Sequence, residues 1–89
     1  MKNLNKENLK RCFKAAKEQN MNYIGLLIEM PGFTMPELII NPRANLDKKL
    51  EYLLNTYDEN LEHKYSKGVK IIGFTFGETC EDAEHDLLN

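Results

Sequence analysis

The chain has 89 residues, of which 42% are hydrophobic and 29% are charged, and its formal net charge is −2. This composition argues against wholesale disorder, and the length supports only one hydrophobic core, so we predict a single domain over residues 1–89. Its apolar runs are shorter than the roughly 20 residues of a membrane span and its first ten residues are polar, which predicts a cytoplasmic protein with no membrane partner.

Residues 5–19 have the spacing of an amphipathic helix, which Asn5 or Asn3 would cap. The predicted apolar stripe consists of Leu9, Cys12, Phe13 and Ala16. A basic stripe, displaced from it by one residue, consists of Lys10, Lys14 and Lys17. Side chains at these intervals share one side of a helix, so the sequence predicts a helix with a basic flank.

A β-hairpin is predicted next. Residues 22–30 alternate in polarity as a strand does, and Met30–Phe33 contains the proline and glycine typical of a type II turn. The second strand, residues 35–40, contains Pro36, which has no N–H to donate, so we place this strand at a sheet edge. The alternative is that residues 30–45 form a loop that grips a ligand.

Residues 46–65 carry the strongest helical pattern in the chain. Its apolar positions are Leu46, Leu50, Leu53, Leu54, Tyr57, Leu61 and Tyr65. We expect one helix of roughly 20 residues, about 30 Å long.

Residues 69–76 predict a third strand. We expect Ile72, Phe74 and Phe76 on one side and Val69, Ile71, Gly73 and Thr75 on the other. Residues 78–89 contain five acidic residues and no lysine or arginine. They predict either a short helix capped by Thr79 or a flexible acidic tail.

The predicted fold is α+β, with the order α-β-β-α-β and a possible final α. The right-handed crossover between the second and third strands gives a three-stranded mixed sheet of order 2-1-3, with the long helix packed on one face. Gly25 and Gly73 should meet on the other face and permit close approach of another backbone. We expect the helix at residues 5–19 to cover that face, with a homodimer contact as the alternative.

Catalytic and metal-binding signals are few, and we predict no enzyme activity, no cofactor and no metal. A hydrolase acting through Glu29 and His63 would require the two side chains to converge. His85 could join Glu81 and Asp82 around a cation, but acidic segments are usually solvated. Cys12 and Cys80 lack metal or redox spacing, so we expect two reduced thiols.

The charges are distributed unevenly, because residues 1–20 carry six basic and two acidic side chains whereas residues 78–89 are acidic. We hypothesise a protein–protein interaction module that binds an unknown partner through a sheet edge, a charged end or an oligomer surface. The candidate interaction surface consists of Lys10, Lys14, Lys17, Tyr23, Glu29 and Phe33. The alternative function is nucleic-acid binding through the three lysines, which the overall acidity and the shortage of arginine make less favourable.

The turn followed by the segment PELIINP, the run YDENL and the strand VKIIGFTFG carry a resemblance. Over residues 22–77 the chain resembles small uncharacterised proteins encoded by phages, prophages and mobile elements of Gram-positive bacteria. The resemblance implies a bacterial or phage context and a host or phage partner. It implies no activity and assigns no role to any residue.

Overall fold

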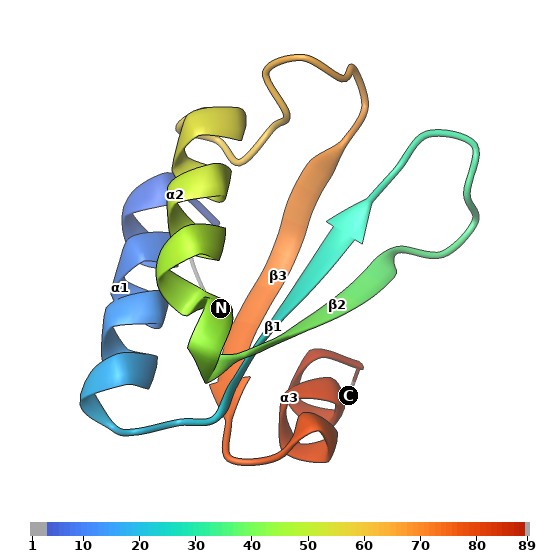
Figure 1. Ribbon diagram of the computed structural model, residues 1–89. Helices are drawn as coiled ribbons and strands as arrows, with labels where there is room; N and C mark the ends of the chain where they lie inside the picture. Colours follow the sequence, from blue (N-terminus) through green and yellow to red (C-terminus); the bar gives the residue numbers. More distant parts are fainter. Residues whose placement is uncertain (1–3, 89) are drawn as a thin grey trace.

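The computed structural model describes residues 4–88 and places three helices around a three-stranded sheet (Figure 1). The elements are α1 (Lys6–Glu18), β1 (Tyr23–Glu29), β2 (Glu37–Pro42), the 3-10 turn η1 (Arg43–Asn45), α2 (Leu46–Thr56), β3 (Lys70–Gly77) and α3 (Cys80–Leu88). The predicted α+β class and the strand order β2-β1-β3 are confirmed. The sheet is antiparallel rather than mixed, because β2 and β3 run in the same direction but are each paired with β1.

The segment containing Pro31 and Gly32 reverses the chain, as predicted. The backbone N–H of Phe33 donates to the Met30 carbonyl at 3.4 Å, and Gly32 has a φ of +84°. These are the features of a type II turn. In place of a ligand-gripping loop, residues 30–36 join β1 to β2, and residues 37–45 form β2 and η1.

β2 is an edge strand, but Pro36 lies just before it and the proline within it is Pro42. The backbone N–H of Arg43 donates to the Asn22 carbonyl at 2.7 Å. Because hydrogen-bonded pairs alternate along an antiparallel ladder, the position opposite Tyr23 points its backbone groups away from β1. Pro42 occupies that position, so its missing N–H falls on the open edge.

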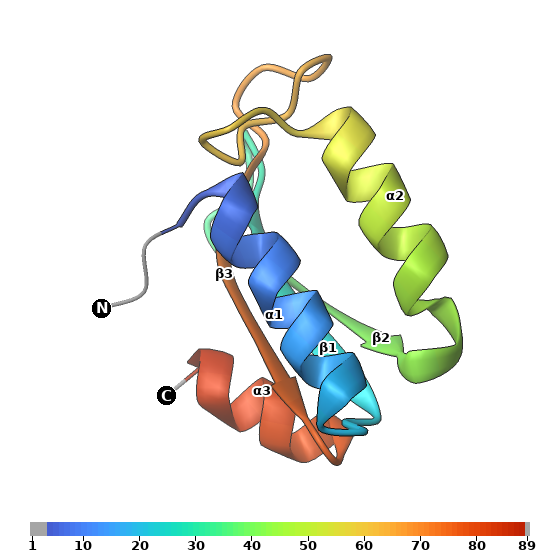
Figure 2. The ribbon, with the colours of Figure 1, turned by 90° about the vertical axis from the view of Figure 1, so that its left-hand side faces the viewer.

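The two faces of the sheet are covered differently from the prediction. Both α1 and α2 lie on one face, and Figure 2 shows them side by side, whereas α3 lies on the other. Phe13 of α1 and Leu53 of α2 belong to the same buried cluster as Leu26 of β1. The helix at residues 5–19 therefore does not cover the second face.

On the second face of the sheet, α3 packs over two glycines. A Cβ atom placed on Gly25 would lie 2.9 Å from Leu87 Cδ1, and one on Gly73 would lie 3.2 Å from Leu87 Cδ2. Gly25 and Gly73 lie together on this face, as predicted, but α3 approaches them through the Leu87 side chain rather than through its backbone. The uncovered apolar face that suggested a homodimer is thus covered by the chain itself.

The long helix ends at Thr56, about halfway along its predicted length. The carboxylate of Asp58 accepts hydrogen bonds from the backbone N–H groups of Asn60 (2.8 Å) and Glu62 (3.1 Å). Aspartate competes with helical hydrogen bonding in this way, and Leu61 takes a left-handed conformation with φ of 62°. Leu61 is nevertheless fully buried. The prediction that Leu61 is an apolar, inward-facing position is therefore confirmed, whereas the prediction that it is helical is wrong.

A bulge changes the faces of β3. Leu27 pairs with Gly73 and Ile28 pairs with Ile71, so Ile72 is an extra residue on β3. The extra residue brings Ile71 into the cluster with Ile28 and Phe74, on the face opposite to the one predicted.

Residues 80–88 form a helix on the sheet. The Thr79 hydroxyl oxygen accepts a hydrogen bond from the Asp82 backbone N–H at 3.0 Å, which confirms the predicted cap. The Thr75 hydroxyl donates to the Asp86 carboxylate and attaches the helix to β3. Among residues 4–88, no helix combines the length and the hydropathy needed to cross a bilayer.

Candidate functional site

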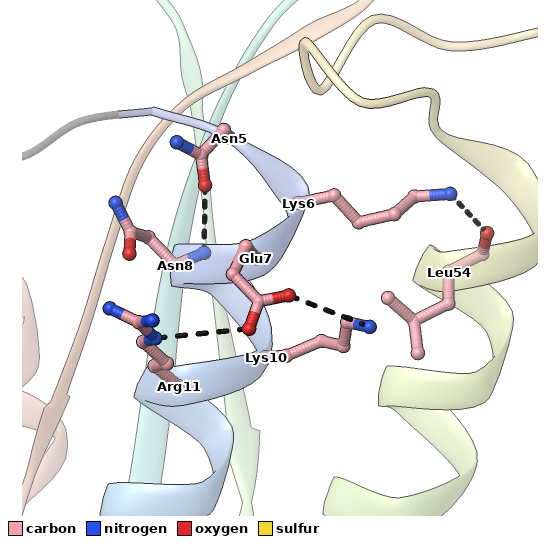
Figure 3. A network of polar contacts seen from close by, with 7 residues as sticks. All are labelled: Asn5, Lys6, Glu7, Asn8, Lys10, Arg11 and Leu54. Carbon is pink, nitrogen blue, oxygen red and sulfur yellow. Dashed lines mark hydrogen bonds and ion pairs between the residues drawn. The ribbon is translucent and has the colours of Figure 1, made fainter.

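A groove runs between α1 and α2. The Lys6 ammonium donates to the Leu54 carbonyl at 2.8 Å (Figure 3), and the Lys17 ammonium lies 2.6 Å from Asp47 Oδ1. The first turn of α1 thus contacts the end of α2, and the last turn of α1 contacts the start of α2. The two helices are therefore antiparallel, with a polar contact at each end of the space between them.

The groove has a volume of about 300 Å³. Its lining consists of Lys10, Phe13, Lys14, Lys17, Glu18, Leu46, Asp47 and Leu50. Phe13 and Leu46 are each only 1% exposed and Leu50 is half-buried, so the floor is apolar. Three of the five charged residues at the rim are lysines. A groove of this composition suits a segment that offers apolar side chains and carboxylates together.

The rim lysines differ in how far their charge is neutralised. Figure 3 shows Lys10 extending from α1 toward α2, and its ammonium lies 3.8 Å from Glu7, which also lies 3.8 Å from Arg11. Ion pairs at such a distance on an exposed surface are weak. Within residues 4–88, Lys14 has no ion-pair partner. Positive charge is therefore available in the middle of the groove.

The six predicted interaction residues do not form one surface. Lys10, Lys14 and Lys17 come together along the groove. Tyr23 begins β1 and is half-buried, whereas Glu29 ends that strand. Phe33 is 71% exposed in the β1–β2 turn. The structure therefore separates the lysines from the other three residues.

The contacts of His63 and Glu29, the residues considered for catalysis, are of the kind that stabilise the fold. His63 Nδ1 accepts a hydrogen bond from the Tyr65 backbone N–H at 3.0 Å, and its ring lies edge-on to Tyr57 with centroids 5.1 Å apart. Glu29 is exposed and lies opposite Lys70 in the ladder. Among residues 4–88 no hydrogen bond or ion pair joins Glu29 to His63, and His63 lies outside α2, which ends at Thr56.

No group of three or more His, Cys, Asp or Glu side chains within residues 4–88 is arranged to hold a metal ion. The cation site considered at His85, Glu81 and Asp82 is therefore not assembled there. Cys12 is half-buried on α1, Cys80 begins α3, and neither cysteine forms a disulfide.

Two further features lie beside α2, one at its C-terminal end and one next to β2. Burial raises the pKa of the Tyr57 phenol above its usual value, and the neighbouring Tyr52 adds to the shift. A shallow depression of about 360 Å³ is lined by Asn41, Asn45, Lys48, Lys49 and Tyr52. Within residues 4–88, the Asn41 side-chain nitrogen is buried without a hydrogen-bond partner. Burying a hydrogen-bond donor without a partner lowers the free energy of unfolding.

Sequence reasoning found the lysines of the groove but not its other wall. Leu46 and Leu50 were predicted only as apolar positions of the long helix, and Asp47 was not singled out. Their positions opposite α1 depend on how two distant segments pack, for which the sequence spacing carries no signal. No protein-family model, curated protein or solved structure matches this chain.

Proposed function

We propose that this protein is a small non-enzymatic accessory protein that binds a protein partner through the α1/α2 groove. The observation that supports this proposal is an apolar floor, formed by Phe13, Leu46 and Leu50, beneath a rim rich in lysine. The partner is a host or phage protein that presents an acidic segment with apolar side chains. The setting is the cytoplasm of a bacterial cell carrying a phage, prophage or mobile element, as the sequence resemblance implies.

The groove is favoured over the sheet edges as the binding surface. On β2, Pro42 removes one donor from the open edge. On β3, the backbone N–H of Ile71 already donates to the Leu61 carbonyl at 2.9 Å, and Lys70 pairs with Glu62. A strand added at either edge would therefore find part of the ladder unavailable.

Selection from a random peptide library on the immobilised protein tests the proposal. We expect enriched peptides to combine aspartate or glutamate with leucine or phenylalanine, and to lose binding to the groove variant K10E/K14E/K17E. The matched control is K48E/K64E/K67E, which reverses three exposed lysines that do not line the groove. Circular dichroism verifies that both variants are folded. Peptides that bind the groove variant as well as the natural protein would overturn the proposal.

Nucleic-acid binding is the second candidate, because Lys10, Lys14 and Lys17 do lie along one groove. Glu18 and Asp47 at the same rim would repel phosphates, so we expect gel shifts with short duplex DNA and with RNA to show no complex at low salt. A complex that dissociates steeply with salt and is absent for K10E/K14E/K17E would replace protein binding with this function.

A further inference from the structure

We infer that the α1/α2 groove also receives α3 from a second copy of the chain, so that copies associate head to tail. This inference rests on the proposed function, since it names one occupant of the same groove. Within one chain the contact cannot form, because α3 lies on the opposite face of the sheet from α1 and α2 (Figure 1). The basic rim and the acidic helix are therefore both presented outward.

The outer face of α3 matches the groove in charge and apolar content. Ala83 is fully buried and Leu87 is half-buried, so these two residues face the sheet. A shallow depression of about 240 Å³ on the other side is lined by Glu81, Glu84, His85 and Leu88. Leu88 is 53% exposed and supplies an apolar side chain for the groove floor. The two glutamates supply carboxylates for the lysine rim.

The two stripes also match in length. Glu81, Glu84 and Leu88 span eight residues of α3, and Lys10, Lys14 and Lys17 span eight residues of α1. At 1.5 Å per residue, each stripe extends about 10 Å along its helix. Glu81 and Glu84 lie within one turn of α3, so a helix laid beside α1 can bring both carboxylates to neighbouring lysines of the rim while Leu88 lies farther along the groove.

The contact has a defined consequence for assembly. Each copy would contribute its groove to one neighbour and its α3 to another, so the interface is heterologous and generates a chain or a ring rather than a closed dimer. Exposed ion pairs are weak and screened by salt, so association requires high protein concentration and low ionic strength.

Sedimentation of purified protein tests the inference. The single chain has a mass of 10.4 kDa. We expect the average mass to exceed this value at high concentration and low salt, and to return to it at high salt. The groove variant K10E/K14E/K17E and the helix variant E81K/E84K should each remain single chains. Natural protein that stays monomeric at low salt, or a variant that assembles alone, would overturn the inference.

Mixing the two variants provides the decisive measurement. The groove variant has an acidic groove and an acidic α3, whereas the helix variant has a basic groove and a basic α3. Both contacts between the two are complementary, so the mixture should assemble although neither does so alone. A mixture that remains monomeric contradicts the inference. K48E/K64E/K67E keeps both surfaces and serves as the control, because it should assemble alone as the natural protein does. If E81K/E84K does not fold, E81Q/E84Q should still lose self-association.

The outcomes separate this inference from the proposed function. Protein that stays monomeric but captures acidic peptides in the groove would refute self-association and leave partner binding in place. Protein that assembles but enriches no peptide would limit the groove to contacts between copies.

Discussion

A Cβ atom placed on Gly77 would lie 2.9 Å from the backbone nitrogen of Ala83, which brings the end of β3 directly against the first turn of α3. Gly25 has an equally short distance, but its neighbour is the end of the flexible Leu87 side chain. A side chain can rotate away from an added methyl group, whereas a backbone atom in a helix cannot. A methyl group at Gly77 would therefore displace the backbone of α3, whereas a methyl group at Gly25 would displace only the Leu87 side chain.

The first prediction concerns these glycines. Gly77→Ala should lower the free energy of unfolding by about 1–3 kcal/mol, because the added methyl group displaces α3. Gly25→Ala should cost less than Gly77→Ala. Urea unfolding followed by circular dichroism measures both changes. Equal costs for the two variants would show that α3 does not rest on the backbone at Gly77.

The second prediction concerns the buried amide of Asn41. Asn41→Leu should raise the free energy of unfolding by about 1 kcal/mol, because it removes a buried donor that has no partner among residues 4–88 and keeps the same branched shape of the side chain. Asn55→Leu, an exposed position on α2, is the matched control and should change stability little. Chemical denaturation compares the two variants. A loss of stability for Asn41→Leu would mean that a bound water or ligand satisfies the amide.

The third prediction concerns pH. Burial raises the pKa of Tyr57, so the folded protein retains the phenol proton at pH values where the unfolded chain has lost it. The stability associated with this proton is complete below the usual pKa of 10.0 and decreases as pH rises above it. Tyr57→Phe should therefore lose less stability between neutral pH and pH values above 10 than the natural protein does. Denaturation midpoints measured across this range test it, and Tyr65→Phe, at an exposed tyrosine, should behave like the natural protein.

The fourth prediction concerns the ion pair at the end of the groove. Lys17 and Asp47 are 53% and 80% exposed, so Asp47→Asn should cost no more than about 1 kcal/mol of stability. The same change makes the rim more positive and should tighten the capture of acidic peptides. Glu51→Gln removes one negative charge from an exposed position of α2 outside the groove lining and is the control. Thermal unfolding and peptide titration follow the two effects, and weaker capture by Asp47→Asn would argue against electrostatic recognition.

Local chemistry explains which parts of the fold were predictable. Pro31 and Gly32 determine their turn by backbone preference alone, and Thr79 caps α3 through a contact three residues away. Both features are visible in a short stretch of sequence. The end of α2 was also encoded locally, in Asp58 and the residues after it, but the periodic leucines favoured a continuous helix.

Features that depend on packing between distant segments were not predictable in the same way. The bulge at Ile72 exchanges the faces of β3 by inserting one residue, although the alternating pattern reads equally well without it. The groove illustrates the same limit. The spacing of Lys10, Lys14 and Lys17 predicted that these side chains share one side of α1, which forms one wall of the groove. Which residues of α2 lie opposite them depends on the positions of both helices on the sheet.

The order of strands has a consequence during synthesis. β1 receives one neighbour from the next strand in the chain, but its other neighbour, β3, follows only after α2 and its loop have been made. Until Lys70 and the residues after it leave the ribosome, one side of β1 has amide and carbonyl groups with no strand beside them. A nascent chain stalled at that stage would expose an unpaired strand edge. Other chains being synthesised on the same messenger RNA could pair with this edge and aggregate.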